Sequence, residues 1–493
     1  MSARYAAGLA VAALAAACAV GPDYQRPQQA VPAAYRFQSE PAPASFADQG
    51  WWEIYQDPTL LELLRVALAN NFDVRIAAER VEQARANLGV AHMQQLPQVS
   101  VAAGAQRART SQYELLPGTP AISDAFVLQG SLSYELDFWG KYRRASEAAR
   151  AQLLASEYAR EDVAAGLVAS VATAYFTLQS LDEQLDITHR TVDSRRKFVE
   201  LTRAQHERGT VSGLDVATAQ AQLAIAEANI PDLERQIAVQ EDLLSVLLGH
   251  SPAPVLRNAE GAIKRLSEGT VPPVPPAGLP SSLLERRPDV REAEQQLVAA
   301  NAEVGVARAN LYPSITLTAA GGVASTALSD LFTAPAHTWS LGGSLLQPLL
   351  DPQRSQYQVE FANAQKRAAI LQYQKSVQSA FQEVADALIT RQKLAEFQKQ
   401  QQLQVEAQRT ANKIALARYR VGYSSYFNVI DADRDLFSAE LSLSAAHLNT
   451  LLSLVQLYRA LGGGWQAPPE TPAAAAATPA GSVAPTPGQP PGG

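Results

Sequence analysis

The sequence contains a single cysteine, Cys18, among 493 residues. One cysteine excludes an intramolecular disulfide and any cysteine-rich metal site. The formal charge of −7 is spread along the chain without clustered lysine or arginine, so nothing marks a nucleic-acid surface. Nucleophile-elbow, zinc-protease and phosphate-loop motifs are missing, and the six histidines are scattered without ligand spacing. We therefore expect no enzyme activity, no cofactor, no metal site and no nucleic-acid partner.

Long hydrophobic runs are lacking as well. The run from Ala6 to Ala17 follows Arg4 and has only twelve residues. A transmembrane helix needs about 20 apolar residues, whereas a secretory signal peptide has a basic start and an apolar core of about 7–15. Residues 1–17 are therefore predicted to be a signal peptide. Because we identify no other stretch long enough for a spanning helix, any membrane crossing would have to use strands.

The position of Cys18 suggests a role for the lone cysteine. Ala16 and Ala17 precede it directly, which resembles the lipobox of bacterial lipoproteins, where the signal is cut before a cysteine whose thiol is acylated. The lipobox prefers leucine where this chain has Ala15. By the same resemblance, Ala19 in place of aspartate favours the outer membrane of a Gram-negative bacterium. We predict lipid attachment at Cys18, for example of palmitate; the alternative is an incidental or buried thiol.

The chain carries an internal repeat of roughly 210 residues. The stretch ARANLGVAHMQQLPQVSV matches ANAEVGVARANLYPSITL and aligns Pro97 with Pro313, 216 residues later. The stretch RGTVSGLDVATAQAQL matches VGYSSYFNVIDADRDL and aligns Gly209 with Gly422, 213 residues later. Two ordered matches at nearly equal spacing indicate a duplicated unit, with these prolines and glycines as its turn anchors.

Each copy is predicted to form a helix, two strands, a very long helix, a tight turn and a returning helix. The long helices are expected over 141–207 and 353–420, which lack proline and are rich in good helix formers. At 1.5 Å per residue, such a helix would extend about 100 Å, which suits a coiled bundle or tube. Gly209 and Gly422 lie where a left-handed cap would end each long helix. Pro231 would kink or interrupt the first returning helix.

Four segments alternate apolar and polar residues in the manner of strands: those near 97–107, 126–138, 313–322 and 338–350. One apolar face and one small polar face are typical of a membrane barrel with a wet interior, for which about 9–11 residues per strand suffice. A half-buried sheet in a soluble domain has the same period. Four strands cannot close a barrel and open edges are not tolerated in hydrocarbon, so a spanning sheet would pool strands from several chains, twelve in a trimer.

Three stretches strongly resemble the TolC-like outer-membrane efflux lipoproteins of the OprM and NodT type. They are CAVGPDYQRP from Cys18, YELDFWGKYRRA from Tyr134, and LLERRPDVREAEQQLVAANAEVGVARANLYPSITLTAAGG from Leu283, and the resemblance extends to about Trp465. It implies a mixed α and β fold and a homotrimer. Four strands per chain would form an outer-membrane β-barrel, continued by a long periplasmic α-helical barrel. It also implies passive efflux of drugs or other small molecules, with an RND-type inner-membrane pump and a periplasmic adaptor as partners.

The repeat and the resemblance together divide the chain into six parts. They are a signal peptide (1–17), a lipidated N-terminal segment and equatorial part (18–58), a first repeat (59–249) whose returning helix is 214–247, an equatorial linker (250–282), a second repeat (283–461) whose returning helix is 426–461, and an equatorial end with a Pro/Ala-rich tail predicted to be disordered (462–493).

The resemblance assigns residues to the inner end of the tube, where the helix turns meet. In relatives a ring of carboxylates lines this constriction; the matching positions are Asn428 and Asp431, so an amide replaces one carboxylate. In relatives, side-chain contacts link neighbouring hairpins, and by the resemblance the matching pair here is Asp215 with Tyr419. Ser424 occupies the position of an arginine that latches the hairpins in some relatives. A ring of Asp431 side chains would attract cations. Alternatively, Asp431 is an ordinary solvated residue or stabilises the first turn of its helix.

Two other functions stay open on sequence alone, as does efflux of metal ions, against which the presence of only two methionines, Met1 and Met93, argues weakly. A non-conducting structural lipoprotein of the envelope would account for the signal peptide and the long helices, but not for four alternating strands. A type I protein-export outer channel would share the fold and work with a different pump. The lipobox favours the efflux type over the export type.

Overall fold

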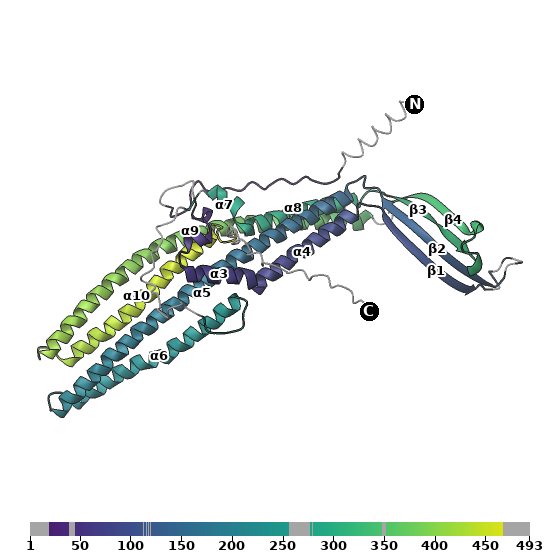
Figure 1. Cartoon of the computed structure of the whole chain (residues 1–493). Coiled ribbons are helices and arrows are strands. Elements are labelled where there is room, and N and C mark those ends of the chain that lie inside the picture. The colour runs from purple at the N-terminus through teal and green to yellow at the C-terminus, as the bar shows by residue number, and fades with distance from the viewer. Residues whose placement is uncertain are drawn as a thin grey trace, which may run out of the picture.

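A computed structural model describes residues 19–38, 45–255, 277–278, 280–347 and 352–466, except 112, 115, 117 and 119. The predicted signal peptide, Cys18, most of the predicted linker and the tail beyond residue 466 lie outside these residues. The chain is elongated. A sheet forms one end, and the turns of two helical hairpins form the other (Figure 1).

The two halves of the chain contain the same order of long elements. The first half has η1 (Phe46–Asp48), α2 (Trp51–Ile54), α3 (Pro58–Asn70), α4 (Phe72–Met93), β1 (Gln98–Arg109), β2 (Ile122–Glu135), α5 (Lys141–Glu207) and α6 (Gly213–Leu247). The second half has α7 (Pro280–Arg286), α8 (Pro288–Ala309), β3 (Ser314–Ser325), η3 (Leu328–Asp330), η4 (Ala334–Ala336), β4 (His337–Leu346), α9 (Pro352–Arg420) and α10 (Tyr426–Ala460). In each half a helix leads into two strands, a long helix and a returning helix.

The strand limits differ from the predicted ones by a few residues. Strand β2 begins at Ile122, earlier than the alternation indicates, and ends at Glu135. It ends there because the next residues start a helix: the Asp137 carboxylate accepts the backbone N–H groups of Tyr142 and Arg143 in the first turn of α5. This is the usual way in which an acidic side chain satisfies free N–H groups at a helix start.

Two prolines act in different ways on the helices. Pro288 occupies the first position of α8, and the preceding Arg287 is extended, so α7 and α8 are separate helices. Pro231 lies inside α6, which continues through it from Gly213 to Leu247; of the two predicted effects, a kink or an interruption, the interruption is therefore wrong. Pro231 is exposed, and water can therefore satisfy the carbonyl that loses its helical hydrogen bond.

The four strands form one antiparallel sheet in the order β1-β2-β3-β4. Strands β1 and β4 each pair on one side only within the described residues. Both outer edges of the sheet therefore carry backbone groups without strand partners in this chain, which can pair with another chain in water and are not tolerated unpaired in lipid.

The helices lie side by side in an order that corresponds to the order of the strands. Near the sheet, α5 contacts α4 and α8, and α8 contacts α9; farther away, α5 contacts α6 and α10, and α10 contacts α9. The contacts of α5 with α8 and with α10 bring the two halves of the chain together (Figure 1). The outermost helices are α4 and α6 on one side and α9 on the other, in line with strand edges β1 and β4 respectively.

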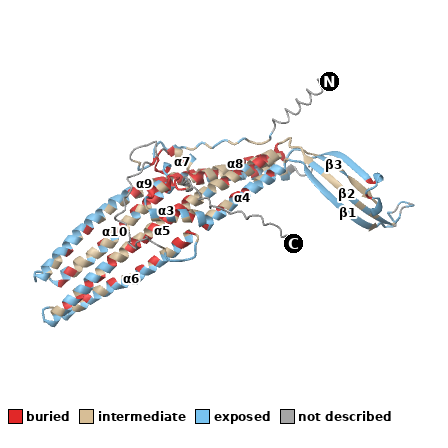
Figure 2. Cartoon of the chain, in the orientation of Figure 1, coloured by how far each residue is buried: buried red, intermediate tan, exposed pale blue. Residues whose placement is uncertain are grey.

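Most of the core lies at mid-length, where buried residues are concentrated in Figure 2. Three stretches far apart in sequence meet there. Ser45 bridges to Ala277, the Trp51 indole donates to the Gln466 carbonyl at 3.2 Å, and the Tyr458 hydroxyl donates to the Gln49 carbonyl at 2.8 Å. We call these three stretches, around 45–51, 277 and 458–466, the collar. The collar lies beside the long helices, and Trp51 is completely buried in it.

One window in α5 is apolar and long enough to cross a membrane by composition, which the sequence analysis missed. Half of that window is buried among other helices. Val168, Val171 and Leu178 belong to the central core, so the window behaves as the core-facing part of a bundled helix.

Candidate functional site

The register of the sheet separates its side chains into two chemically different faces. Residues directly opposite each other on neighbouring strands project to the same side. The pairs Val99 with Leu132 and Ala319 with Leu341 lie on one face. That face carries Val99, Val101, Ala103, Ala105, Phe126, Leu128, Leu132, Tyr134, Ile315, Leu317, Ala319, Val323, Trp339, Leu341 and Leu345. It becomes polar only near the loops, where Arg107 and Asp124 pair at 3.6 Å.

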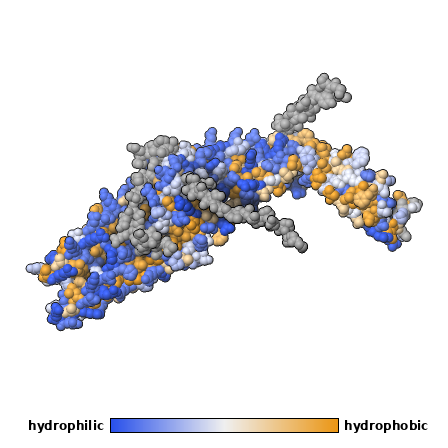
Figure 3. Space-filling view, in the orientation of Figure 1, coloured by the Kyte–Doolittle hydropathy of each residue, from blue (hydrophilic) through white to orange (hydrophobic). Residues whose placement is uncertain are grey.

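This apolar face is exposed in the chain. Trp339 is 79% exposed, Leu341 76% and Val101 75%. Figure 3 shows apolar side chains gathered on this end of the molecule. A half-buried sheet of a soluble domain would pack such a face against a second layer, and the described residues form no such layer over it. The apolar face therefore suits a lipid environment.

The opposite face of the sheet is small and polar. It carries Gln98, Ser100, Gln106, Gln129, Ser131, Ser133, Glu135, Ser314, Thr316, Thr318, Thr338, Ser340 and Ser344, interspersed with Ala and Gly and with the apolar Val127 and Leu346. The hydroxyls of Ser100 and Ser131 lie 2.7 Å apart across β1 and β2. A surface of hydroxyls, amides and small side chains can be wetted without holding a solute tightly.

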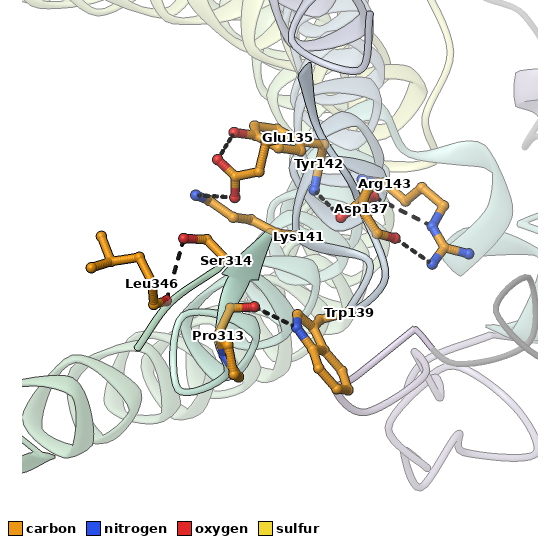
Figure 4. Close-up of polar contacts among 9 residues, drawn as sticks. All are labelled: Glu135, Asp137, Trp139, Lys141, Tyr142, Arg143, Pro313, Ser314 and Leu346. Carbon is orange, nitrogen blue, oxygen red and sulfur yellow. Dashed lines mark hydrogen bonds and ion pairs between the residues drawn. The ribbon is translucent and has the colours of Figure 1, made fainter. Parts of the chain in front are cut away.

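A compact set of contacts joins the sheet to the helices (Figure 4). The Glu135 carboxylate accepts from the Tyr142 hydroxyl at 2.8 Å and pairs with Lys141 at 3.5 Å, so the charge at the base of the polar face is compensated. The Trp139 indole donates to the carbonyl of Pro313 at 2.8 Å. Its ring also stacks on Tyr312, with centroids 4.6 Å apart. The strand of one half is thereby fastened to the helix-to-strand turn of the other.

The anchor prolines lie at matching turns. Pro97 immediately precedes β1, and Pro313 immediately precedes β3, each after the helix that leads into the sheet. Proline cannot continue a helix and sits well at the first residue of a strand.

The stretch after Cys18 runs from this junction along the outside of α8. The backbone N–H of Val20 donates to the Trp139 carbonyl at 3.0 Å. Farther along, Asp23 pairs with the buried Arg144 at 2.7 Å. Arg26 pairs with Glu294 at 2.7 Å. We call residues 19–26 the strap.

A close approach of two glycines holds the strap to α8. Gly21 has φ +120°, and a Cβ there would lie 2.6 Å from the Cα of Gly305. Side chains at these two positions would therefore push the strap off the helix.

A hollow of about 530 Å³ lies on the opposite face of α8, in the half near the sheet. Helices α4, α5, α8 and α9 all contribute to it. Its lining is Ala84, Asn87, Ala145, Ala148, Ala149, Gln152, Gln296, Ala299, Ala300, Glu303, Gln365 and Ala368. The four helices therefore curve around a concave surface that is almost uncharged and made of alanine and amide side chains.

Glu303 is the one charged residue in the lining of this hollow, and burial raises the pKa of its carboxyl. Asp289, Glu292 and Glu303 follow one another on α8 at intervals of three and eleven residues, close to whole turns, and so share the concave face. Glu294, which the strap contacts, lies two residues out of phase with Glu292 and faces the other way.

A second hollow, of about 400 Å³, lies at mid-length and is strongly charged. Its lining is Asp162, Arg287, Asp289, Glu383, Asp386, Ala387, Thr390, Gln456, Arg459 and Ala460. Burial, and then the charge of Asp289, raise the pKa of Asp162. Burial and the charges of Asp162 and Asp289 likewise raise the pKa of Glu292. Negative charge is therefore crowded on the concave side at this level.

Arg287 organises the second hollow. Its guanidinium donates to both carboxylate oxygens of Asp289 at 2.9 and 2.7 Å and to the Ala460 carbonyl at 3.0 Å, and it pairs with Glu383 at 2.7 Å. Burial alone would lower the pKa of Arg287, but the Asp289 and Glu383 carboxylates raise it above its ordinary value. The start of α8, the middle of α9 and the end of α10 are thus joined by one side chain.

The far ends of the hairpins turn at the two glycines that the repeat singled out. Gly209 has φ 73° and Gly422 has φ 80°, the left-handed conformation of helix caps. After the first turn, Ser212 and Asp215 form a reciprocal capping box at the start of α6. Asp215 thus serves its own helix in this chain.

The other predicted tip residues lie together around the turn between α9 and α10; Asn428 is exposed, and Tyr419, Ser424 and Asp431 are partly buried. The Tyr419 hydroxyl donates to Gln205 on α5 at 2.8 Å. Burial, and then the charge of Asp215, raise the pKa of Tyr419. The Asn428 amide donates to the Ser424 hydroxyl at 2.9 Å. Asp431 pairs with Arg434, 2.6 Å away.

Sequence reasoning missed two arginines near these tips. Arg434 offsets the charge of Asp431, and its place three residues later on the same helix is a signal that the sequence does contain. Arg195 lies farther up α5, is 6% exposed and pairs with Asp433 on α10. No local pattern in the sequence relates residues so far apart.

Comparisons with known proteins agree with this geometry. The family model described as outer membrane efflux protein matches residues 63–250 and 279–463. A protein from Pseudomonas putida named probable efflux pump outer membrane protein TtgC is 36% identical over 456 residues, covering 91% of this chain and 93% of the relative. SilC of Salmonella typhimurium, named a probable outer membrane lipoprotein, is 33% identical and covers 92% and 96%.

The solved structure of the outer-membrane channel OprN superimposes with a TM-score of 0.83 at 30% identity. It covers 91% of this chain and all of the OprN chain. The similarity therefore extends over the sheet, the long helices and the collar together.

Proposed function

The chain belongs to the outer membrane efflux protein family. We propose that three copies of it form a conducting tube. The protein is an outer-membrane efflux channel, a transport component of an efflux pump. The observation that carries the proposal is the sheet: one face is apolar and exposed, and the other is small and polar.

The open edges favour a closed ring of identical chains. Edge β1 lies in line with α4 and α6, and edge β4 lies in line with α9. If β4 of one chain pairs with β1 of the next, every strand gains its second partner and α9 meets α4 and α6 of the neighbour. Closure removes the unpaired backbone groups that hydrocarbon does not tolerate. Three chains give a barrel of about twelve strands, wide enough for an open lumen.

In this trimer the concave surface would become the wall of the tube. The polar face of the sheet would continue into the hollow lined by alanine and amides, and then into the charged hollow around Arg287. Weak, non-directional contacts suit passive conduction, because a solute must not be held on its way. Bond-making chemistry has no place in this function, and selection of the solute would fall to the pump.

The partners are proposed from the family. A periplasmic adaptor and an RND-type inner-membrane pump would feed the tube from inside. The relatives are named for toluene, solvents or antibiotics, so small, partly apolar molecules are the proposed cargo.

Lipid attachment at Cys18 fits the path of the strap. Ala19 lies beside Gly140, where a Cβ on the glycine would come within 2.9 Å of Ala19. Gly140 precedes α5 at the base of the sheet. An acyl chain on the neighbouring cysteine would therefore start at the level where the apolar face begins. It would enter the membrane leaflet that surrounds this end of the sheet.

Duplication accounts for the equal order of elements in the two halves. The family model matches the chain in two consecutive segments, and both segments contain a strand pair followed by a helical hairpin. We propose that the two halves descend from one unit.

The hairpin tips would form the inner constriction, with Asp431 facing its axis. Asp431→Ala should then weaken block of the pore by divalent cations and lower its cation preference. The pairing with Arg434 reduces the expected effect. Single-channel recordings with both properties unchanged would remove Asp431 from the constriction.

The mass of the detergent-extracted particle tests the ring. Light scattering in mild detergent should give a protein mass of three chains, and the same particle should form discrete conductance steps in a planar bilayer. A monomer, or a protein released from membranes without detergent, would contradict the proposal. A trimer without conductance would keep the ring and contradict the open lumen.

A further inference from the structure

Below the collar the molecule consists of two helical hairpins side by side. The first is α5 with α6, and the second is α9 with α10 (Figure 1). They meet mainly where α5 contacts α10. If the tube closes at these ends, its width depends on how the second hairpin is held against the first.

Arg195 on α5 makes a contact that crosses from one hairpin to the other. Its Nε donates to Asp433 Oδ2 on α10 at 2.8 Å, and its Nη1 donates to the Gln222 carbonyl on α6 at 2.7 Å. The guanidinium also lies 5.4 Å from the ring centre of Phe437 on α10. One planar side chain, 6% exposed, thus links three helices.

Other ion pairs at this level stay within one hairpin. Arg196, the next residue, pairs with Glu227 on α6 at 3.0 Å. Arg409 on α9 pairs with Glu440 on α10 at 2.8 Å. Both arginines are more than half exposed. The contact of Arg195 with Asp433, in contrast, joins the two hairpins.

The surroundings of Arg195 exclude most water but leave some space. Phe198 and Tyr426 stack with ring centres 4.7 Å apart, and Val199 and Val429 are buried beside them. A cavity of about 40 Å³ is lined by residues of all four helices, Arg195 and Asp433 included. An ion pair shielded in this way is weakly screened by salt. A cavity of this size holds about one water molecule beside the ion pair.

We propose that Arg195 is a positioning residue that holds the second hairpin in place and so keeps the inner end of the tube narrow. This inference rests on the proposed function. The bond to Gln222 keeps Arg195 oriented on its own hairpin when the hairpins separate, so of the contacts of Arg195 the bond to Asp433 is broken on opening. The Tyr419–Gln205 bond nearer the tips also crosses between the hairpins and would break with it. Asp433 is 26% exposed and can be hydrated as it leaves. Three equivalent contacts would open together in a trimer.

Single-channel recording of the purified full-length protein in planar bilayers tests the proposal. Asp433→Asn keeps the shape and removes the charge, and Arg195→Met keeps the length of the side chain. Loss of a hydrogen bond between charged groups should raise the open-to-closed ratio by about tenfold or more. The double variant should open no more than the stronger single variant, because both remove one contact. Asp433→Glu, which keeps the charge, should restore a low ratio.

Arg196→Met is the matched control, because it removes a neighbouring ion pair within one hairpin. It should leave the open-to-closed ratio unchanged. Correctly assembled Arg195→Met and Asp433→Asn particles that open no more often than the unmodified protein would overturn the proposal, as would additive effects in the double variant. If Arg195→Met does not assemble, Asp433→Asn decides the matter alone. Lack of conductance in every form, the unmodified one included, would contradict the channel itself.

Discussion

At the sheet end Leu341 is 76% exposed, whereas Leu178 on α5 is 1% exposed. The same residue type thus faces outward in one region and inward in the other. Around Leu341 the polar side chains lie on the opposite face of the sheet, and around Leu178 they lie on the outer faces of helices. In the proposed barrel the sheet would have an apolar surrounding and a wet interior, whereas the collar region has an apolar core. The boundary between these environments would then lie near Trp139 and Gly140, between β2 and α5.

A charge placed on the apolar face should have the largest effect on this contrast. Leu341→Lys, near the middle of β4, should destabilise the inserted protein by about 2–4 kcal/mol, because a cation at the bilayer midplane loses its hydration. Denaturant titration of the protein folded into lipid vesicles measures this loss.

Ser340→Lys is the control for Leu341→Lys, because Ser340 projects to the opposite face. It should cost little, since a lysine in a wet lumen keeps its water. Equal losses for the two variants would show that the two faces do not experience different environments.

The mid-length region offers the opposite case, in which a buried charge supports the structure. Arg287→Met should destabilise the helical part by about 1.5–3 kcal/mol, because three partners of a buried guanidinium lose charge-assisted hydrogen bonds. Thermal unfolding followed by circular dichroism reports this change.

Arg286→Met gives the comparison for Arg287. Arg286 pairs with Asp48 and is more exposed, so its removal should cost clearly less. A loss as large as that of Arg287→Met would mean that any arginine at this turn contributes equally, which the geometry contradicts.

The smallest effect concerns pH. Burial and the charge of Asp289 raise the pKa of Asp162, opposed by Arg459 and Arg287 and reinforced by Glu383. A carboxyl whose pKa is higher in the folded state favours folding below its unfolded pKa and loses that contribution as pH rises through the folded pKa. The helical part should therefore be slightly more stable at acidic than at alkaline pH through this group, by less than about 1 kcal/mol.

Asp162→Asn should flatten this pH dependence and raise the thermal midpoint on the alkaline side. Asp242→Asn, at an exposed site on α6, serves as the control and should change neither. Unfolding curves of the three proteins across the acidic to alkaline range decide the question. An unchanged slope in Asp162→Asn would mean that Asp162 is already ionised in the folded protein at little cost.

Much of the site could be read from local patterns. Alternation around Phe126 and Val99 predicts two-faced strands, and the register confirms that the apolar residues of β1 and β2 share a face. Gly209 and Gly422 have the left-handed conformation expected of helix ends. The short helix α7 ahead of Pro288 and the passage of α6 through Pro231 without interruption were decided only by the tertiary structure. Both depend on whether the freed backbone groups reach water or another partner.

The sequence by itself determined the local features of this protein, namely helix length, strand alternation and caps, and it also identified the family. These follow from interactions between residues close in the chain, so their signals survive in a linear reading. Only the tertiary structure decided which charges meet. Arg195 with Asp433, Arg287 with Glu383, and Asp23 with Arg144 are pairs far apart in sequence, and each is one among many possible pairings. Packing of the long helices brings these partners together, because burial of a guanidinium is tolerated only where the fold supplies its carboxylates and carbonyls.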